Sequence, residues 1–371
     1  MFYRNNISPL TSTKSNSLLK RIALLCFVLL MISGENISAQ VIKNNGAYIT
    51  IVTGTVVDKI VDVENTSGTI ANDGVINLTG NWTNGGTYSS TSGTVNYNGS
   101  GSQNVAGLSY HHLTLSTSGT KTLPASASVA GDLTLSGTTL FDDGGFQIVG
   151  NGSGALSMAA GTSLTLGSAG TATLFPTNFT NANISLTAGS TVIYNSDQSQ
   201  TISGTPTYQN LTLNATASVT KTLDAATTIN GNLTVNANNT LADGGFQIIG
   251  NASGTLSLAA GTTLTLGNVA TATIFPTNFI TGNITLNSTS TVVYNSDQAQ
   301  TISAVPTYGH LTLTSTAGVT KTISTTVTTN GDITVNINNI LNITGAGDVT
   351  VGGNFNLMGN ITNAGILTIG L

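Results

Sequence analysis

A 100-residue repeat constrains the fold of this chain more than any other feature. Residues 143–223 recur at 243–323 without a gap, and 55 of the 81 positions are identical. Many of the differences exchange Val with Ile, Ser with Thr or Gly with Ala. A long repeat at a fixed offset is typical of chains that are built from stacked structural units.

A shorter period lies inside this repeat. An apolar–Thr/Ser–apolar tripeptide recurs, often 20 or 22 residues apart. In an extended strand its two apolar side chains lie on one face and the hydroxyl on the other. One strand cannot bury its leucines alone, but coils stacked about 4.8 Å apart would align leucine on leucine and threonine on threonine. The tripeptides begin at residues 113, 133, 164, 184, 211, 233, 264, 284, 311 and 333.

This pattern predicts an all-β fold, a parallel β-solenoid with coils of about 20 residues. About 15 such coils would form a rod about 70 Å long, and each 100-residue block would hold about five of them. A row of β-sandwich domains is the alternative, because sandwich strands also follow one another at a spacing of about 8–12 residues. The 20-residue period, with Asn and Gly at its corners, favours the solenoid.

The first 39 residues have the layout of a secretory signal peptide. Basic residues precede the apolar run Ile22–Ile32, and small residues before Gln40 form a cleavage site. The run has 11 residues, whereas a membrane-spanning helix needs about 20; an uncleaved anchor is the alternative. We therefore expect export and no transmembrane segment in the mature chain. Cys26 lies in the apolar run, so the mature chain contains no cysteine.

The mature chain divides into a cap and a solenoid. Residues 40–67 alternate like strands but do not match the repeat, so we expect an N-terminal cap. Residues 68–371 form the predicted solenoid, with a degraded copy of the repeat at about 41–142 and further copies at 143–242 and 243–342. Nothing polar closes the C-terminal end. We expect either that the solenoid continues beyond this sequence or that its uncapped end docks on a partner, including another copy.

Charge is sparse and excludes several classes of partner. After residue 39 there is no arginine, and five lysines stand against thirteen carboxylates. Nucleic-acid binding needs a basic stripe and anionic lipids need clustered cations, so neither partner is expected. Lys121, Lys221 and Lys321 mark equivalent points of the blocks. We expect them to be displayed on the surface at regular intervals of about 24 Å.

The residues argue against an enzyme. Asp142 and Asp143 precede two glycines, which is typical of a turn, and Asp197 and Asp297 are expected to be solvated corner residues. His111 and His112 correspond to Gln209-Asn210 and Gly309-His310 in the other copies, a substitution that a metal ligand or general base would not tolerate. A calcium-binding solenoid would need aspartates at a spacing that is absent. We predict no catalytic, cofactor-binding or metal-binding residues.

The outward threonines are the candidate contact surface. Stacked on a flat face, they would repeat hydroxyl and methyl groups at lattice-like intervals and could bind ice or ordered sugar chains. The alternative is that threonine is simply a good strand residue. The four phenylalanines of the two FPTNF segments are expected to fill corners, whereas Trp82 could contact a sugar. The candidates are Thr114, Thr134, Thr165, Thr212, Thr234, Thr265, Thr312, Thr334 and Trp82.

The amino-acid sequence of the first copy resembles that of a known group of proteins. GNWTNGGTYSSTSGTVNYNGSGSQNV, followed by YHHLTLSTSGTKTL and GDLTL, resembles the repeats of large secreted, cell-surface β-helix proteins of Bacteroidetes bacteria. The resemblance extends from Gly68 to the end and implies an adhesin-like protein or extracellular stalk. The C-terminal sorting domain that many such proteins carry is absent from this sequence.

Three functions therefore stand open. The first is a non-enzymatic, secreted or cell-surface structural or adhesin-like protein that makes multivalent weak contacts along repeated faces, with extracellular polysaccharide or a host or neighbouring cell surface as partner. The second is a polysaccharide- or ice-binding module that uses the outward threonines. The third is a polysaccharide lyase-type enzyme, which the missing ionisable groups disfavour.

Overall fold

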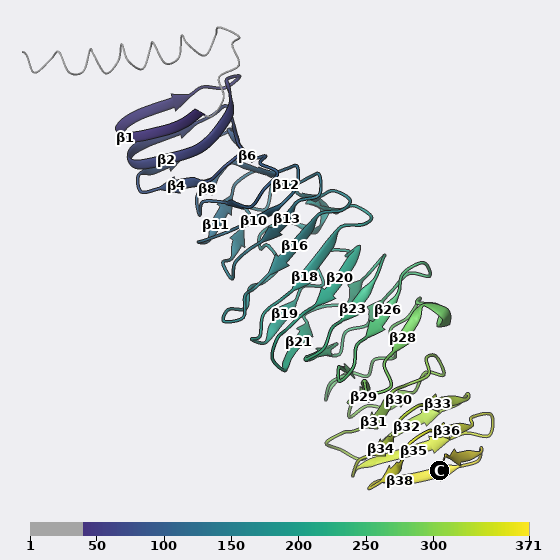
Figure 1. Cartoon of the computed structure of the whole chain (residues 1–371). Coiled ribbons are helices and arrows are strands. Elements are labelled where there is room, and N and C mark those ends of the chain that lie inside the picture. Colours follow the sequence, from purple (N-terminus) through teal and green to yellow (C-terminus); the bar gives the residue numbers. More distant parts are fainter. Residues whose placement is uncertain (1–39, 371) are drawn as a thin grey trace, which may run out of the picture. The chain divides into compact units, whose positions relative to one another are not determined.

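The computed structural model describes residues 40–370, and the predicted signal peptide (1–39) lies outside the described residues. Within 40–370 the regular structure is strand, apart from two single-turn 3-10 helices, η1 (Asn181–Asn183) and η2 (Thr281–Asn283). The strands stack in parallel into a β-solenoid of about 16 turns, and successive turns are about 21 residues apart in the sequence. Figure 1 shows them following one another coil by coil from β1 (purple) to β38 (yellow). The predicted fold class is confirmed.

Three long sheets run along the stack. The ten-stranded sheet contains β1 (Gln40–Ile51), β2 (Val56–Asn72), β3 (Val75–Leu78), β4 (Trp82–Asn84), β5 (Thr87–Ser89), β6 (Thr94–Tyr97), β9 (His112–Leu115), β12 (Leu133–Leu135), β15 (Leu156–Met158) and β17 (Ile184–Leu186). The nine-stranded sheet contains β7 (Gln103–Asn104), β10 (Thr120–Thr122), β13 (Leu140–Asp142), β16 (Ser163–Leu166), β18 (Thr191–Tyr194), β20 (Asn210–Leu213), β23 (Leu233–Val235), β26 (Leu256–Leu258) and β28 (Ile284–Leu286). The eight-stranded sheet contains β19 (Gln200–Ile202), β21 (Val219–Leu223), β24 (Asn239–Ala242), β27 (Thr263–Leu266), β29 (Thr291–Tyr294), β31 (His310–Leu313), β34 (Ile333–Val335) and β37 (Phe355–Leu357).

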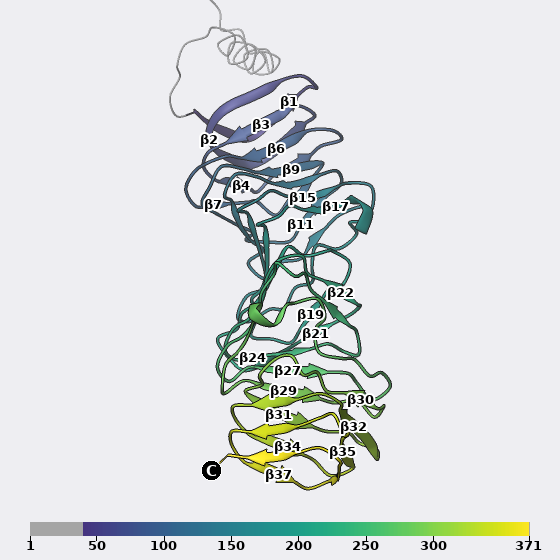
Figure 2. The ribbon, with the colours of Figure 1, turned by 90° about the vertical axis from the view of Figure 1, so that its right-hand side faces the viewer.

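Four smaller sheets complete the coils. They contain β8 (Ser109–Tyr110), β11 (Ala127–Val129) and β14 (Ile148–Val149); β22 (Thr227–Thr228) and β25 (Ile248–Ile249); β30 (Gln300–Thr301), β32 (Val319–Ile323), β35 (Asn339–Ile343) and β38 (Asn360–Asn363); and β33 (Val327–Thr329), β36 (Val349–Val351) and β39 (Leu367–Ile369). In Figure 2, β29, β31, β34 and β37 of the eight-stranded sheet lie one above another.

Neighbouring coils pair in the register that the tripeptides predict. Leu113 pairs with Leu133 and Thr114 with Thr134, so like side chains stack on each face of the sheet. The leucines are completely buried, and the threonines between them are half-buried. Because burying one leucine contributes about 1.5–3 kcal/mol, a column of such pairs explains why each coil needs its neighbours.

Equivalent strands of successive blocks lie in different sheets. The TVxY strand pairs with the following xLTL strand in every copy: β6 with β9, β18 with β20, and β29 with β31. These pairs belong to the ten-, nine- and eight-stranded sheets respectively. Since β17, β18 and β19 are consecutive in the chain and belong to these same three sheets, the sheets are three successive faces of the coil.

Each block therefore advances by four coils and one further face, rather than by about five coils. In the nine-stranded sheet, Lys121 pairs with Phe141, Phe141 with Leu164, Leu164 with Val192, and Val192 with Leu211, which makes four coils. Leu113, the equivalent of Leu211, lies one strand before Lys121, on the preceding face. The same step takes Lys221 to Leu311 in the eight-stranded sheet.

Coil length varies in a repeated way. Leu164 pairs with Val192, 28 positions on, and Val192 then pairs with Leu211, only 19 positions on. The same long and short coils recur 100 residues later, from Leu264 to Val292 and Leu311. The additional residues of the long coil fall between Thr165 and Thr177, because Thr165 pairs with Asp142 and Thr177 with Val149 of the preceding coil. The FPTNF segment (175–179) forms one wall of the site described below.

The first coil begins earlier than the predicted solenoid boundary at residues 67 and 68. β2 is one continuous strand that pairs along its length with β3, β4 and β5 of the next coil. The boundary therefore falls inside β2, and β1 pairs with β2 as the edge strand of the ten-stranded sheet. The exposed ion pair between Lys43 and Glu64, at 3.0 Å, joins β1 to β2.

Candidate functional site

Two equivalent clefts, one in each later block, are the candidate sites. The first cleft has a volume of about 220 Å³ and lies between the FPTNF segment (175–179) and the turn that follows β19. The second cleft, about 490 Å³, lies between 275–279 and the turn after β30. The first cleft adjoins β17, the last strand of the ten-stranded sheet, and the second adjoins β28, the last of the nine-stranded sheet. Each cleft thus lies where one sheet ends.

A buried tyrosine pair fixes one wall of the first cleft. The hydroxyls of Tyr194 and Tyr208 are 3.0 Å apart. The amide of Ser203 donates to the Tyr194 hydroxyl at 3.1 Å, and the Tyr208 hydroxyl donates to the Ser203 carbonyl at 2.7 Å. Burial raises the pKa of Tyr194 to about 12, so this pair stays neutral under ordinary conditions. The same pair recurs as Tyr294 and Tyr308.

The opposite wall is the FPTNF segment itself. Phe175 packs edge-on against Tyr208, with ring centroids 6.3 Å apart. Phe179 covers Gly150, where an added Cβ would lie only 2.8 Å from its ring, so a larger residue there would displace the ring. Both phenylalanines are at least 95% buried. They fill a corner, as predicted, and Phe275 and Phe279 do the same in the second copy.

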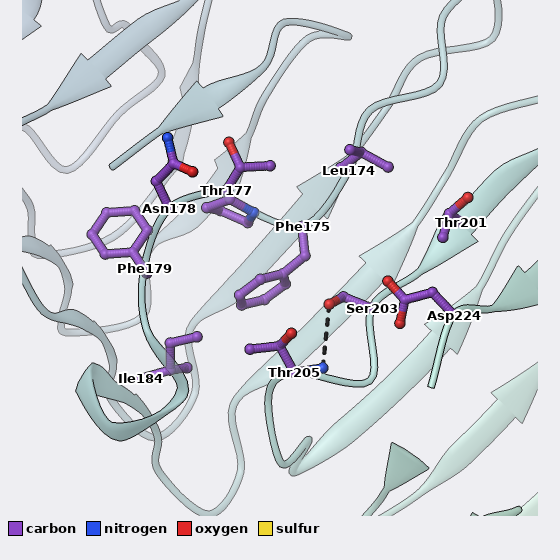
Figure 3. Close-up of a pocket in the computed structure, with 11 residues that line it drawn as sticks. Leu174, Phe175, Thr177, Asn178, Phe179, Ile184, Thr201, Ser203, Thr205 and Asp224 are labelled. Atoms are coloured by element: carbon purple, nitrogen blue, oxygen red, sulfur yellow. Dashed lines mark hydrogen bonds between the residues drawn. The ribbon is translucent and has the colours of Figure 1, made fainter. Parts of the chain in front are cut away.

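The lining of the first cleft combines hydroxyls, one carboxylate and apolar side chains. Figure 3 shows Thr201, Ser203 and Asp224 along one side, with Phe179 and Ile184 on the opposite side. One carboxylate oxygen of Asp224 accepts the amide of Gly204 at 2.7 Å. The second oxygen of Asp224 takes part in no hydrogen bond within residues 40–370.

The second cleft keeps the frame and changes the lining. The phenylalanines, the tyrosine pair and Ser303 are identical to their counterparts. Asp224 is replaced by Ser324, which does not line the cleft, and Thr205 by Val305. Ile280 replaces Thr180 and is 52% exposed. The first cleft is therefore the polar member of the pair and the second the apolar one.

The aspartates hold the corners of the coils together. Eleven of the twelve accept a backbone N–H, ten of them from an adjacent coil. Asp197, for example, accepts the hydroxyl of Thr216 and its amide, the latter at 2.6 Å, and these two hydrogen bonds lower the pKa of its carboxyl. The corner position predicted for Asp197 and Asp297 is thus confirmed, with a second role as links between coils.

The two aspartates that precede Gly144–Gly145 show the same use of carboxylates. Asp142 accepts only the local amide of Gly144. Asp143 is buried and accepts the amides of Gly145 and Gly167, each at 2.8 Å, together with the hydroxyl of Thr173. Burial raises the pKa of the Asp143 carboxyl, although these hydrogen bonds oppose that effect. The predicted turn is confirmed, and it is also a link to the next coil.

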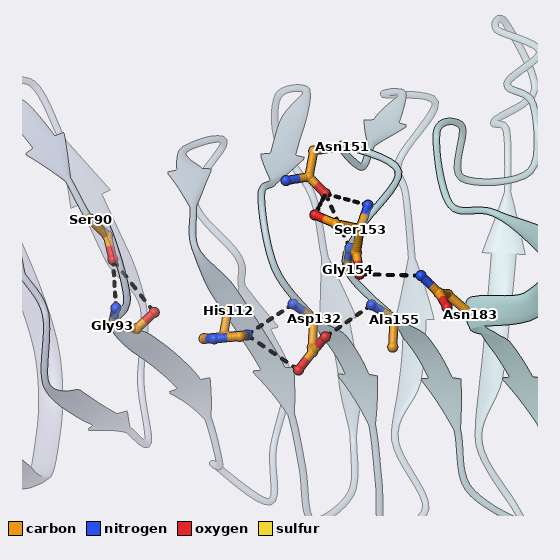
Figure 4. Close-up of polar contacts among 9 residues, drawn as sticks. All are labelled: Ser90, Gly93, His112, Asp132, Asn151, Ser153, Gly154, Ala155 and Asn183. Carbon is orange, nitrogen blue, oxygen red and sulfur yellow. Dashed lines mark hydrogen bonds and ion pairs between the residues drawn. The ribbon is translucent and has the colours of Figure 1, made fainter.

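The histidines belong to a similar corner. The amide of Asp132 donates to His112 Nδ1 at 2.9 Å, and a carboxylate oxygen of Asp132 accepts the amide of Ala155 at 2.9 Å (Figure 4). The pattern recurs at His310 and Asp332, whereas Asn210 and Asn232 occupy these positions in the middle block. An amide replaces the imidazole as acceptor, which explains the interchange seen in the sequence.

The equivalent lysines are buried, contrary to the expected surface display. Lys121, Lys221 and Lys321 have no exposed surface and lie in three different sheets. The ammonium of Lys221 donates to the carbonyl of Ser196 at 2.7 Å and to Oε1 of Gln200 at 2.8 Å. Burial lowers the pKa of each lysine to about 8.

The predicted contact residues do not form one surface. Trp82 is 3% exposed and packs edge-on against Tyr88, with centroids 5.1 Å apart, so the expected sugar contact at Trp82 is wrong. The eight threonines are all half-buried and are divided among three faces, not one. Thr114 and Thr134 lie in the ten-stranded sheet; Thr165, Thr212 and Thr234 in the nine-stranded sheet; and Thr265, Thr312 and Thr334 in the eight-stranded sheet.

The sequence pattern did not identify the clefts. The available signal was the FPTNF segment and the Thr-Ile-Ser tripeptide, which recur together in both later blocks. Among residues 40–370 no three His, Asp, Glu or Cys side chains are grouped as metal ligands would be. That same part of the chain contains no helix long and apolar enough to cross a membrane. No protein-family model, curated protein or solved structure matches the chain.

Proposed function

We propose that this chain is a non-enzymatic, exported protein of the cell surface or extracellular matrix that acts by several weak contacts along its solenoid. The observation that carries this proposal is the use of the aspartates. Acid–base chemistry on polysaccharides needs a pair of carboxylates facing one substrate, and eleven of the twelve aspartates are engaged by backbone amides, ten of them between coils.

The arrangement of the blocks supports contacts in several directions. Because each block steps by one face, equivalent surfaces point to successive sides of the solenoid. Weak sites that are linked in one chain gain apparent affinity when several bind together. An adhesin-like or stalk protein of the kind that the sequence resembles has this requirement, with extracellular polysaccharide or a neighbouring cell surface as partner.

The test measures catalysis and contact on the same samples. The purified protein is incubated with insoluble polysaccharide particles and with whole bacterial cells. We expect the fraction of protein retained on the particles to rise steeply with the density of protein on their surface. We expect no release of reducing ends or unsaturated sugars from the polysaccharide. Heat-unfolded protein is the control. Steady release of saccharide products, or retention no greater than that of the unfolded control, contradicts the proposal.

A second candidate function, binding to ice or to ordered sugar chains, is favoured by one face only. In the eight-stranded sheet an unbroken outward column contains Thr220, Thr240, Thr263 and Thr291. The neighbouring column contains Thr222, Thr265, Thr312 and Thr334, interrupted by Ala242 and Val293. T240Y in the middle of this face should abolish any thermal hysteresis, whereas T134Y on the ten-stranded sheet should not.

Self-association through the last described coil is part of the main proposal. Leu357, Met358, Ile366 and Ile369 in this coil are each more than 40% exposed. Exposed apolar side chains of this kind favour association with another chain. Light scattering on the wild type and on an L357K/I366K variant tests this self-association. Molar masses of wild type and variant that are equal at all concentrations contradict it.

A further inference from the structure

We propose that the first cleft binds one neutral sugar unit, with Asp224 as the residue that selects it. This inference rests on the proposed contact function and names the ligand class of one contact site. Ligand pockets for drug-sized molecules usually measure about 300–1,000 Å³. The first cleft, at about 220 Å³, is suited to a single ring. Since the cleft is open to solvent, that ring can belong to a longer chain that passes over it.

The chemistry of the lining matches a sugar better than other ligands. The free oxygen of Asp224 can accept hydrogen bonds from ring hydroxyls, and a carboxylate acceptor makes such bonds stronger than a neutral group does. The hydroxyls of Thr201 and Thr205 take part in no hydrogen bond within residues 40–370 and can both donate and accept. Leu174, which is 47% exposed at the rim, offers an apolar surface for the C–H face of a ring.

The same lining disfavours charged ligands. None of the residues that line the first cleft is basic, so an anionic sugar would face the Asp224 carboxylate without compensation. A metal ion would find a single carboxylate there, whereas calcium takes six to eight oxygen ligands. A neutral, polyhydroxylated ligand is the class that uses the carboxylate, the hydroxyls and the apolar rim together.

Comparison of the two clefts separates the site from the fold. The second cleft keeps the same frame with Ser324 in place of Asp224 and Val305 in place of Thr205. The fold therefore does not require a carboxylate or a hydroxyl at these positions. Asp224 also differs from the other corner aspartates of its block, since Asp143 and Asp197 use both carboxylate oxygens in hydrogen bonds to the protein. The polar lining of the first cleft is thus available for a ligand.

The experiment uses an array of neutral oligosaccharides of glucose, galactose, mannose and N-acetylglucosamine, with sialylated and uronate-containing oligosaccharides on the same slides. The purified full chain should bind neutral oligosaccharides only. D224N keeps an acceptor for the Gly204 amide and removes the charge, and should weaken binding about tenfold. D224S, which copies the second cleft, should abolish it. S324A, a change at the equivalent position of the third block, should leave binding unaltered.

Three results would overturn the inference. They are wild-type protein that binds no neutral oligosaccharide above the unfolded control, D224N and D224S variants that retain wild-type affinity, and S324A weakening binding as much as D224N. Hydrogen exchange in β19 and β21 establishes that each variant is folded. If the variants fail to alter glycan binding while particle and cell retention persists, the sugar site is wrong and the contact function stands. If wild-type retention on particles and cells is absent, the contact function itself is wrong.

Discussion

The buried lysines of the first and second blocks occupy equivalent positions but have different partners. The ammonium of Lys121 donates only to backbone carbonyls, at Gly99, Gly101 and Ser118. The ammonium of Lys221 donates to one backbone carbonyl and to the side-chain amide of Gln200. What stays constant is a cation that is enclosed by oxygens inside a corner of the coil.

The second block extends this corner into a network. Nε2 of Gln200 donates to the carbonyls of Leu166 and Thr173, and the hydroxyl of Thr173 donates to Asp143. Lys221 is thereby connected to a buried carboxylate three coils away, and the third block repeats the connection from Lys321 to Asp243. In the first block, Gln103 bonds instead to backbone groups at Gly99, Leu78 and Gly80. The comparison teaches that the buried lysine is common to the three blocks, whereas its connection to a buried carboxylate is found in the two later blocks.

The largest expected effect breaks the network at its carboxylate. D143A leaves two buried amides and a hydroxyl without their acceptor and should destabilise the surrounding coils by about 3–5 kcal/mol. D142A removes one local turn hydrogen bond and should cost less than about 1 kcal/mol. Hydrogen exchange of amides in β13 and β16 gives the local free energies of opening. Equal costs for the two variants would show that Asp143 has no special role.

The second effect is a pH dependence that all three blocks should share. Burial lowers the pKa of the three lysines to about 8, whereas an exposed lysine has a pKa of about 10.4. Between about pH 8 and pH 10 the unfolded chain binds more protons than the folded chain, so the free energy of unfolding rises with pH. We expect a rise of about 1–3 kcal/mol for each lysine.

Above about pH 10 the trend should reverse. Burial raises the pKa of Tyr194 and Tyr294 to about 12, so tyrosines of the unfolded chain lose their protons first and stability falls. Urea unfolding midpoints from pH 7 to 11 measure both parts of the curve. A variant in which all three lysines are changed to methionine should lack the rise and keep the fall. A flat profile in the wild type would contradict the lowered lysine pKa values.

A smaller effect compares the two later blocks with each other. T173V and T273V each remove one hydroxyl that donates to a buried carboxylate, while the two backbone amides on that carboxylate remain. Each substitution should cost about 1–2 kcal/mol, and the two costs should agree. Hydrogen exchange in β16 and β27 measures them. Costs that differ by more than the cost of one hydrogen bond would mean that the networks are not equivalent.

The smallest effect separates the first block from the second. K121M leaves three backbone carbonyls without a donor, whereas K221M leaves one carbonyl and Oε1 of Gln200, which still accepts the amide of Ser196. K121M should therefore be the more destabilising by about 1 kcal/mol, the net value of one hydrogen bond. Local opening of β10 and β21 provides the comparison. If K221M costs more, Gln200 depends on its lysine and the network is stronger than its separate contacts.

The coil could be predicted from the sequence because Leu-Thr-Leu tripeptides impose alternation, and alternation imposes register. The buried lysines were missed because charged side chains are rarely enclosed. A signal was nevertheless present: Val219, Lys221 and Leu223 alternate with threonines, which places the lysine on the inward face. The burial of Trp82 and the clefts depend on contacts between coils of 18 to 28 residues, and only the paired structure reveals which residues those lengths bring together.

The step of four coils and one face has a consequence for how such a gene can change. Recombination between copies of the 100-residue unit would lengthen the protein and at the same time turn everything downstream by one side of a three-sided column. Only the gain or loss of three units together would restore the original orientation. The number of copies would thus determine the direction in which the downstream repeats face, so variants with identical repeats could present them on different sides.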